Sequence, residues 1–225
     1  MKKLICILML CALALPLSGC SGKNPYAGAE NPIATITMSD GSTMRFELHL
    51  EVAPNTVANF CSLANDGFYD GLEFFRVVPG VLIQAGCPDN DGTGNAGYTI
   101  KGEFSANGVE NSLSHVRGTL SMARITGRNN SASSQFFIMQ GNYPEYDGSY
   151  AAFGTALDAE TLAVLDAIAN RAVDANSVPM VRQTIATIRV NTHGLELKPK
   201  TIPIEEKPTP TPEPTEKTSS GGKSS

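Results

Sequence analysis

The sequence has few of the residues that most enzyme chemistry uses. Its 225 residues include three histidines, five cysteines and no tryptophan. No HExxH or GxSxG motif occurs, and no cysteines are paired at the spacing of zinc ligands. These absences argue against a zinc protease, a serine hydrolase and a zinc finger. We therefore expect neither a metal nor a cofactor.

The chain also lacks an excess of positive charge. It carries 17 Lys and Arg against 22 Asp and Glu, a net charge of -5, without a basic stripe. Because nucleic-acid binding depends on clustered Lys and Arg, we expect no nucleic-acid partner.

The polar groups that are present have ordinary structural explanations. We expect His49 and His193 to be structural or exposed, and His115 to serve in a loop or as a cap. The Gly-rich stretch 90–97 lacks the Lys-Ser/Thr of a phosphate loop. The nearby Asp89 and Asp91 lack the calcium-binding loop that ends in Glu, which favours a turn-rich loop.

The start of the chain, MKKLICILMLCALALPLSGC, is typical of a targeting segment. Two lysines precede an apolar run, 4–15, that is too short to span a bilayer. The LSGC that follows resembles a bacterial lipobox, in which the cysteine, here Cys20, is lipidated and becomes the mature N-terminus. The alternative is a plain secretory signal cleaved nearby. We favour the lipoprotein, which predicts an extracytoplasmic protein held on a bacterial membrane by its lipid.

Two segments of biased composition flank one domain, residues 31–194. Residues 21–30 are small and polar, as expected of a tether. Residues 195–225 are rich in Pro, Thr, Ser, Glu and Lys and are predicted to be a disordered tail, with a cell-envelope contact as the alternative. The domain contains Cys61 and Cys87. Two buried thiols are favoured, although a disulfide is permitted outside the cytoplasm.

Periodic patterns predict a mainly β fold. Alternation over 33–50 indicates a hairpin, and helical patterns cover 53–67 and 158–170, with Asp158 as N-cap of the second helix. About eight short strands with two helices favour a closed eight-stranded antiparallel β-barrel with the helices over its ends. The other expected strands lie at 74–78, 81–85, 97–101, 118–123, 135–140, 153–157 and 183–191.

The run FFRVVPGVLIQAG, residues 74–86, holds one charge, Arg76, and one amide, Gln84, among apolar residues. A buried charge is costly unless something needs it. With LSMA (120–123), SQFFI (134–138) and YDGSYAAFG (146–154), this run makes residues 33–192 resemble the cyclophilin family of peptidyl-prolyl isomerases. The resemblance implies an eight-stranded barrel capped by two helices, with the substrate groove on the outside of the barrel.

The family's reaction fits a site without a nucleophile. Rotation about an X-Pro amide breaks the partial double bond, against a barrier of about 20 kcal/mol, and no covalent bond is made or cut. As resonance is lost, the prolyl nitrogen becomes a hydrogen-bond acceptor. The resemblance assigns the donor to Arg76, which would bind the twisted amide selectively. A hydrogen bond to a charged donor is worth about 1.5–3 kcal/mol, so the rest must come from a proline pocket and from anchoring of the backbone.

The resemblance also assigns the remaining site residues. Gln84 would bind substrate backbone and help to position the guanidinium, and Phe137 with Leu82 would form the floor of the proline pocket. The rest of the expected groove consists of Val81, Ala123, Arg124, Gln135, Tyr146 and Tyr150.

The sequence departs from the family pattern at three positions. Val81 stands where Phe is most common, which shortens one wall of the pocket. Glu145 stands where the best-known members have a tryptophan that supports cyclosporin binding, so we predict weak cyclosporin binding. Tyr150 replaces an expected histidine, and we predict activity with altered sequence preference.

These features lead to three hypotheses. The favoured one is a monomeric, lipid-anchored isomerase that acts on prolyl bonds of exported, folding proteins. The second is a cyclophilin-like module that binds or chaperones proline-containing segments with little turnover. The third is an envelope structural protein that works through its tail.

Overall fold

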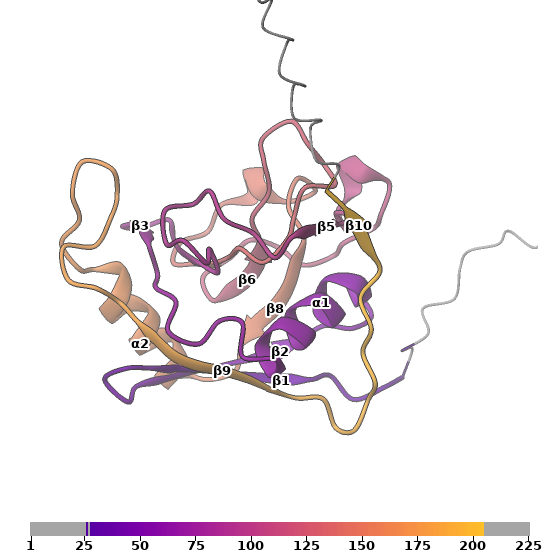
Figure 1. Ribbon diagram of the computed structural model, residues 1–225, viewed down its shortest axis with the longest axis horizontal. Coiled ribbons are helices and arrows are strands. Elements are labelled where there is room, and N and C mark those ends of the chain that lie inside the picture. The colour runs from indigo at the N-terminus through magenta and orange to yellow at the C-terminus, as the bar shows by residue number, and fades with distance from the viewer. Residues whose placement is uncertain (1–25, 27, 205–225) are drawn as a thin grey trace, which may run out of the picture.

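The computed structural model describes Tyr26 and residues 28–204, which fold around one curled antiparallel sheet (Figure 1). Eight strands pair in the order β3-β4-β7-β6-β8-β2-β1-β9, and β5 and β10 form a separate pair. The strands are β1 (Ile33–Met38), β2 (Thr43–Leu48), β3 (Arg76–Val78), β4 (Leu82–Ala85), β5 (Tyr98–Ile100), β6 (Thr119–Met122), β7 (Phe136–Met139), β8 (Ala152–Ala156), β9 (Ile185–Asn191) and β10 (Thr201–Pro203). The helices are α1 (Pro54–Asn65) and α2 (Ala159–Ala169), with 3-10 turns η1 (Ser105–Asn107) and η2 (Pro144–Tyr146).

The predicted closed barrel is wrong, because the two end strands of the sheet, β3 and β9, do not pair with each other. Contact between these two ends is made upstream of β3. Glu73 and Thr184 form an isolated bridge, and the N–H of Ile185 donates to the carbonyl of Leu72 at 2.8 Å. The eight-stranded sheet is therefore a partly closed barrel, since β3 is three residues long and begins after this bridge.

The first two strands form the predicted hairpin. Side chains in β1 alternate between half-buried and buried, as expected for a strand with one face on the core. The turn is held by Asp40, whose Oδ1 accepts the backbone N–H of Ser42 at 2.9 Å and its hydroxyl at 2.6 Å. Gly41 takes a φ of 87°, a conformation that favours glycine.

In each helix a carboxylate accepts at least one backbone N–H of the first turn. Asp158 is the N-cap of α2, as predicted, and accepts the N–H of Thr161 at 2.8 Å. Helix α1 has no side-chain cap of its own. Instead the buried Glu103, distant in sequence, accepts the N–H groups of Asn55 and Thr56 at 3.1 and 2.7 Å. A negative charge at this end also complements the helix dipole.

Alternation within two central strands separates the core from the outer face of the sheet. Phe136 of β7 points inward and packs edge-on against Phe60 of α1 with the ring centroids 5.4 Å apart. The next residue, Phe137, belongs to a second, smaller cluster on the other face. In β4, Ile83 joins the core, whereas Gln84 faces outward with Phe137. The candidate site therefore lies on the outside of the barrel.

The structure corrects the predicted boundary of the tail at residue 195. Leu195 and Leu197 pack against the core. Asn55 of α1 then exchanges two hydrogen bonds with the backbone of Lys200, at 2.6 and 3.1 Å, and β10 pairs with β5. Figure 1 shows this segment running from β9 past α1 to β5. Residues 195–204 are thus part of the fold, and the rest of the predicted tail lies outside the described residues.

The structure bears on the predictions made for the cysteines and leaves those for the N-terminal segment outside the described residues. Cys61 and Cys87 are both buried and unpaired, as favoured from the sequence. Neither α1 nor α2, the two α-helices among the described residues, is long and apolar enough to cross a membrane. The predicted signal with Cys20 and most of the predicted tether lie outside the described residues.

Candidate active site

Strand register places four side chains in one row across the outer face of the sheet. Arg76 of β3 stands opposite Gln84 of β4, and Gln84 stands opposite Phe137 of β7. Phe137 in turn stands opposite Ser121 of β6. Residues directly opposite in antiparallel strands have Cβ atoms about 4.5–5.5 Å apart on the same face. The row therefore brings a guanidinium, an amide and a phenyl ring together.

A chain of side-chain hydrogen bonds fixes the guanidinium. Arg76 Nη1 donates to Gln84 Oε1 at 3.2 Å, and Gln84 Nε2 donates to Gln135 Oε1 at 3.0 Å. Gln135 Nε2 donates to the carbonyls of Gly92 and Gly94, both at 2.9 Å. Each amide is thereby held in one orientation by its partners. The chain ends on the backbone of the 87–97 loop, which anchors it.

Arg76 itself is exposed, so its charge does not carry the free-energy cost of burial that its apolar neighbours in the sequence suggested. Within the described part of the chain, it forms no salt bridge. Its hydrogen bond to Gln84 uses one of five N–H donors, which leaves others to face solvent or a ligand. The guanidinium is thus positioned but not neutralised.

An apolar cluster, predicted from the sequence to be the floor of a proline pocket, adjoins this row. Phe137 and Leu82, predicted from the sequence, are 3% and 5% exposed, and they cluster with Met139, which sequence reasoning did not single out. Such a surface can bind an apolar ring but offers no group for covalent chemistry. The half-buried residues around the floor are Val78, Val81, Ala123, Tyr143, Tyr146 and Tyr150.

Three tyrosines form the far rim of the pocket. The rings of Tyr146 and Tyr150 stand edge-on to Phe137, with centroids 6.1 and 5.6 Å away, and Tyr143 extends the group. Burial, followed by the neighbouring Tyr150, raises the pKa of the Tyr146 phenol above its usual value. The Tyr146 phenol therefore remains a neutral hydrogen-bonding group at neutral pH. Glu145, beside them, is exposed.

Arg124 lies folded against the rim. Its Nε donates to the carbonyl of Ser149 at 2.8 Å, and its guanidinium carbon lies 4.8 Å from the Tyr150 ring centroid and 5.3 Å from that of Phe104. These contacts hold the charge over aromatic faces. The preceding Ala123 uses its N–H to bond the carbonyl of Gln135 at 3.0 Å.

A cleft of 960 Å³ continues from the row of site residues. One wall contains Gln84, Gln135 and Ala123, so the cleft is continuous with the predicted substrate groove. The rest of the lining mixes polar, basic and apolar residues. They comprise the loop residues Gly92, Thr93, Gly94 and Asn95, the segment Arg124–Thr126, Arg128–Ser131, Ser133, Thr99 and Ile204.

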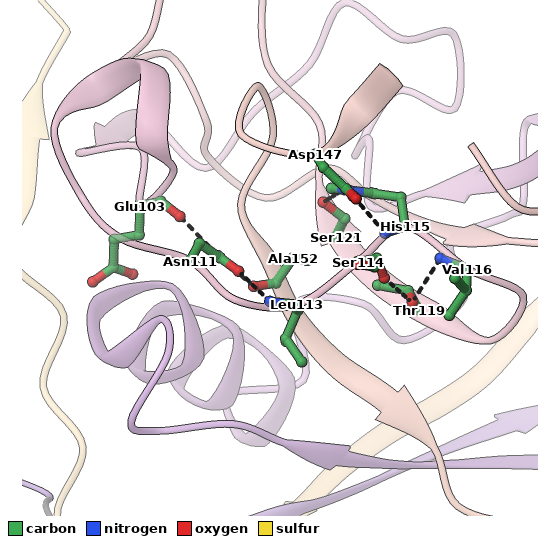
Figure 2. Close-up of polar contacts among 10 residues, drawn as sticks. All are labelled: Glu103, Asn111, Leu113, Ser114, His115, Val116, Thr119, Ser121, Asp147 and Ala152. Atoms are coloured by element: carbon green, nitrogen blue, oxygen red, sulfur yellow. Dashed lines mark hydrogen bonds and ion pairs between the residues drawn. The ribbon is translucent and has the colours of Figure 1, made fainter. Parts of the chain in front are cut away.

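His115 lies in a loop, as predicted, but sequence reasoning did not find that its ring is buried behind the pocket. Figure 2 shows its ring between Asp147 and Ser121. Nδ1 lies 2.8 Å from Asp147 Oδ1, and Nε2 lies 3.0 Å from Ser121 Oγ. These partners indicate that Nδ1–H donates to the carboxylate and Nε2 accepts from the hydroxyl. Burial lowers the pKa of His115 although Asp147 opposes this effect, so the ring is neutral at neutral pH.

Backbone contacts hold this histidine in place. The backbone N–H of His115 also donates to Asp147 at 2.7 Å, and Thr119 Oγ1 donates to the carbonyl of Ser114 at 2.8 Å (Figure 2). The imidazole is then stacked on Phe137, with centroids 6.0 Å apart. A single histidine between Ser114 and Val116 carries no sequence signal for such a position, because its carboxylate partner Asp147 lies 32 residues away in the sequence.

One group of possible metal ligands occurs among the described residues, Cys87 with Asp89 and Asp91, whose ligand atoms lie within 4.8 Å of one another. Both carboxylates are exposed. The sulfur of Cys87 already accepts the N–H groups of Gly92 and Gly94 at 3.3 and 3.2 Å. This arrangement holds the loop that ends the hydrogen-bond chain from Arg76. We assign it no metal.

Comparison with known proteins gives the same family over most of the chain. Residues 33–190 match the model of the cyclophilin type peptidyl-prolyl cis-trans isomerase/CLD family. A peptidyl-prolyl cis-trans isomerase of Synechococcus elongatus is 45% identical over 135 residues, which cover 60% of this chain and 88% of that protein. Peptidyl-prolyl cis-trans isomerase B of Bacillus subtilis is 49% identical over 117 residues, covering 52% of this chain and 78% of that protein.

A solved structure agrees with the fold. The crystal structure of a Cryptosporidium parvum cyclophilin type peptidyl-prolyl cis-trans isomerase, in the presence of the dipeptide Ala-Pro, matches with a TM-score of 0.63 and 30% identity. The match covers 71% of this chain and 98% of that one. From the outward row of Arg76, Gln84 and Phe137, the matching family model and these relatives, we conclude that the chain belongs to the cyclophilin-type peptidyl-prolyl cis-trans isomerase family.

Proposed function

We propose that this protein is a lipid-anchored peptidyl-prolyl isomerase that acts outside the cytoplasm on X-Pro bonds of exported, folding proteins. The observation that carries the catalytic part is the position of Arg76. It is exposed and held by Gln84, without a carboxylate partner among the described residues, in the same row as Phe137.

In this proposal Arg76 donates a hydrogen bond to the prolyl nitrogen as the amide twists. The planar amide nitrogen is a poor acceptor because its lone pair is delocalised. The bond therefore forms mainly in the transition state, which is the condition for acceleration. One charge-assisted bond contributes about 1.5–3 kcal/mol. Gln84 and Gln135 pre-orient the donor, so that less order has to be gained during the reaction.

The apolar floor would bind the proline ring. Phe137 and Leu82 present carbon surface, and Tyr146 and Tyr150 close the far side. The Cryptosporidium parvum relative was crystallised in the presence of Ala-Pro, which supports a proline-containing ligand for this groove. We expect the domain to work as a monomer.

Val81 favours a second candidate, a proline-binding or chaperone module with little turnover. A valine side chain covers less of the pocket wall than the phenylalanine expected from the resemblance, so the proline would be gripped less firmly. Turnover measured on a proline-containing tetrapeptide decides between the two, since the binding module would bind the peptide without accelerating its isomerisation.

The activity test compares native protein with Arg76→Ala, Arg76→Lys and the control Arg171→Ala, which removes an exposed arginine outside the site. We expect Arg76→Ala to lower kcat/KM by about 10- to 100-fold. Arg76→Lys keeps the charge but loses the planar fork, so its activity should be intermediate. Native-like activity in Arg76→Ala would contradict the mechanism, and an inactive native protein would contradict the isomerase.

The anchoring test concerns Cys20. Cys20→Ala should release the protein into the medium or leave an unprocessed precursor, because the lipobox then has no cysteine to receive the lipid. Fractionation of cells and immunoblotting measure both outcomes. A Cys20→Ala protein that stays membrane-bound with a correctly processed N-terminus would contradict the lipoprotein. A soluble native protein, cleaved elsewhere, would favour the plain secretory signal.

A further inference from the structure

We propose that residues 205–214 of this chain, EEKPTPTPEP, bind in the chain's own substrate groove and compete there with other proline-containing segments. This inference rests on the proposed function, because it takes the outer face around Phe137 as the proline site. The occupant is a segment of the same chain that lies beyond the described residues.

The chain leaves the fold at a fixed point just before this segment. Strand β10 pairs with β5 in a defined register, from Thr201 opposite Ile100 to Pro203 opposite Tyr98. Upstream, Asn55 holds both the N–H and the carbonyl of Lys200. The described chain therefore ends at one place on the surface, next to β5 (Figure 1).

The point where the described chain ends lies beside the candidate groove. Ile204, the last described residue, lines the 960 Å³ cleft. The same cleft is lined by Gln84 and Gln135, which orient Arg76, and by Ala123, which packs against the pocket floor. The next residue of the chain thus starts at the entrance to the groove. Ile204 remains 44% exposed, so the cleft still has room for further chain.

The composition and the length of residues 205–214 also favour this segment as the occupant. The segment contains four X-Pro bonds, which end at Pro208, Pro210, Pro212 and Pro214. An extended chain spans at most about 3.3–3.6 Å per residue, so Pro208 can lie up to about 14 Å from Ile204 and Pro214 up to about 35 Å. The cleft that Ile204 lines also contains Gln84, which stands opposite Phe137 in the pairing of β4 with β7, so the segment has to cross this one cleft to reach the pocket. Several of these prolines can therefore occupy the pocket in turn.

The cleft lining and the start of the segment carry opposite charges. The residues that line the cleft are all described; they include Arg124 and Arg128, and none is acidic. The segment begins with Glu205 and Glu206 directly after Ile204. Opposite charges in a partly enclosed cleft attract, most strongly at low salt. The first two residues of the segment therefore carry the charge opposite to that of the cleft lining.

Tethering makes even weak binding effective. A ligand attached by a short chain has an effective concentration in the millimolar range, so a groove with millimolar affinity for a prolyl peptide would be substantially occupied. Such occupancy raises the apparent KM for an external substrate and leaves kcat unchanged at saturation. It also makes the segment's own X-Pro bonds substrates of the enzyme.

The test uses the full mature chain in two length-matched variants. One replaces Pro208, Pro210, Pro212 and Pro214 by Ala. The control replaces Thr218, Ser219 and Ser220 by Ala, downstream of the proposed binding segment. We expect the proline variant to have a KM for a prolyl tetrapeptide lower by about two- to tenfold, with kcat unchanged. The control should match the native protein in both constants. Equal KM values in all three proteins would contradict the proposal.

A binding measurement separates this proposal from the isomerase itself. The side-chain amide NMR signals of Gln84 and Gln135 should shift between the native chain and the proline variant, and a synthetic peptide of residues 205–214 added to that variant should shift them back. These signals report occupancy even if turnover is absent. Identical signals in the two proteins would overturn the proposal. Shifts that disappear on dilution would also overturn it, because they would indicate the segment of a second copy.

Discussion

The imidazole of His115 lies nearly parallel to the phenyl ring of Phe137, with 6.0 Å between the centroids and 22° between the planes. Phe137 is the floor of the proposed proline pocket, and His115 packs against it from the buried side. Hydrogen bonds to Asp147 and Ser121 fix the imidazole in turn. A ring that takes no part in the proposed chemistry therefore sets the position of one that binds substrate.

This contact predicts the effect of replacing the histidine. His115→Ala would leave a cavity beside Phe137 and an unpaired Ser121 hydroxyl, with a loss of about 2–5 kcal/mol in the free energy of unfolding. We expect kcat/KM to fall mainly through a higher KM, because the floor becomes loose. His115→Phe should restore most of the KM but not the stability. Denaturant unfolding and peptide assays measure these effects, and an unchanged KM in folded His115→Ala would contradict the positioning role.

The same histidine predicts a pH dependence of stability. Burial lowers the pKa of His115 in the folded protein below its usual value of 6.5. Burial alone would raise the pKa of Asp147, but the hydrogen bonds from His115 outweigh this effect, so that pKa is lowered as well. The unfolded chain therefore takes up the proton first. Stability should fall as pH decreases through about 6.5 toward the lowered pKa, and this group should cause no further loss below that value.

The control for this prediction is His115→Phe, which removes the titrating group. Its free energy of unfolding should change less between pH 7 and pH 5 than that of the native protein. His49, whose pKa is also lowered by burial, stays in both proteins and contributes equally. Parallel curves of unfolding free energy against pH would show that His115 is not the source of the effect.

The hydrogen-bond chain from Arg76 predicts that replacing Gln135 lowers activity, although Gln135 is joined to Arg76 through Gln84. Gln135→Ala removes the acceptor for Gln84 and the donor to the 87–97 loop, so Arg76 loses its fixed orientation. We expect kcat/KM to fall by about 2- to 10-fold, the equivalent of one neutral hydrogen bond. Gln135→Glu keeps the acceptor and should retain the larger share of kcat. Equal kcat values for the two variants would argue against this chain of contacts.

Glu145 predicts a response to cyclosporin. It is exposed beside Tyr146, at the position where the resemblance expects tryptophan, and we expect the native protein to bind cyclosporin weakly. Glu145→Trp adds a large apolar ring at the rim and should tighten binding by about tenfold or more, since burying one such side chain is worth about 1.5–3 kcal/mol. Inhibition of peptide isomerisation measures the affinity. Tight binding by the native protein would contradict the prediction.

Local patterns were enough to predict much of this fold. Alternation in IATITM and the Asp40–Gly41 turn identified the first hairpin, and Asp158 identified the start of α2, because these signals depend on neighbours in sequence. The resemblance then named Arg76, Gln84 and Phe137. Their alignment in one row depends on pairing between β3, β4 and β7, which no single stretch of sequence specifies.

The features that were missed depend on distant partners. His115 is buried because Asp147 and Ser121 satisfy its nitrogens, and neither is its neighbour in the chain. Residues 195–204 were assigned to the tail because their composition includes few apolar side chains. In the structure, hydrogen bonds from Asn55 and from β5 hold this segment on the fold instead. The barrel was expected to close because strand number alone does not reveal how short β3 is.

Phe136 and Phe137, adjacent in β7, belong to separate clusters. A substitution at an outward position can therefore change which peptides are bound without leaving a cavity in the core. A substitution at an inward position can change thermal stability without altering the residues that contact a bound peptide. Divergence in client preference and adaptation to a new growth temperature can thus proceed independently along the same four-residue strand.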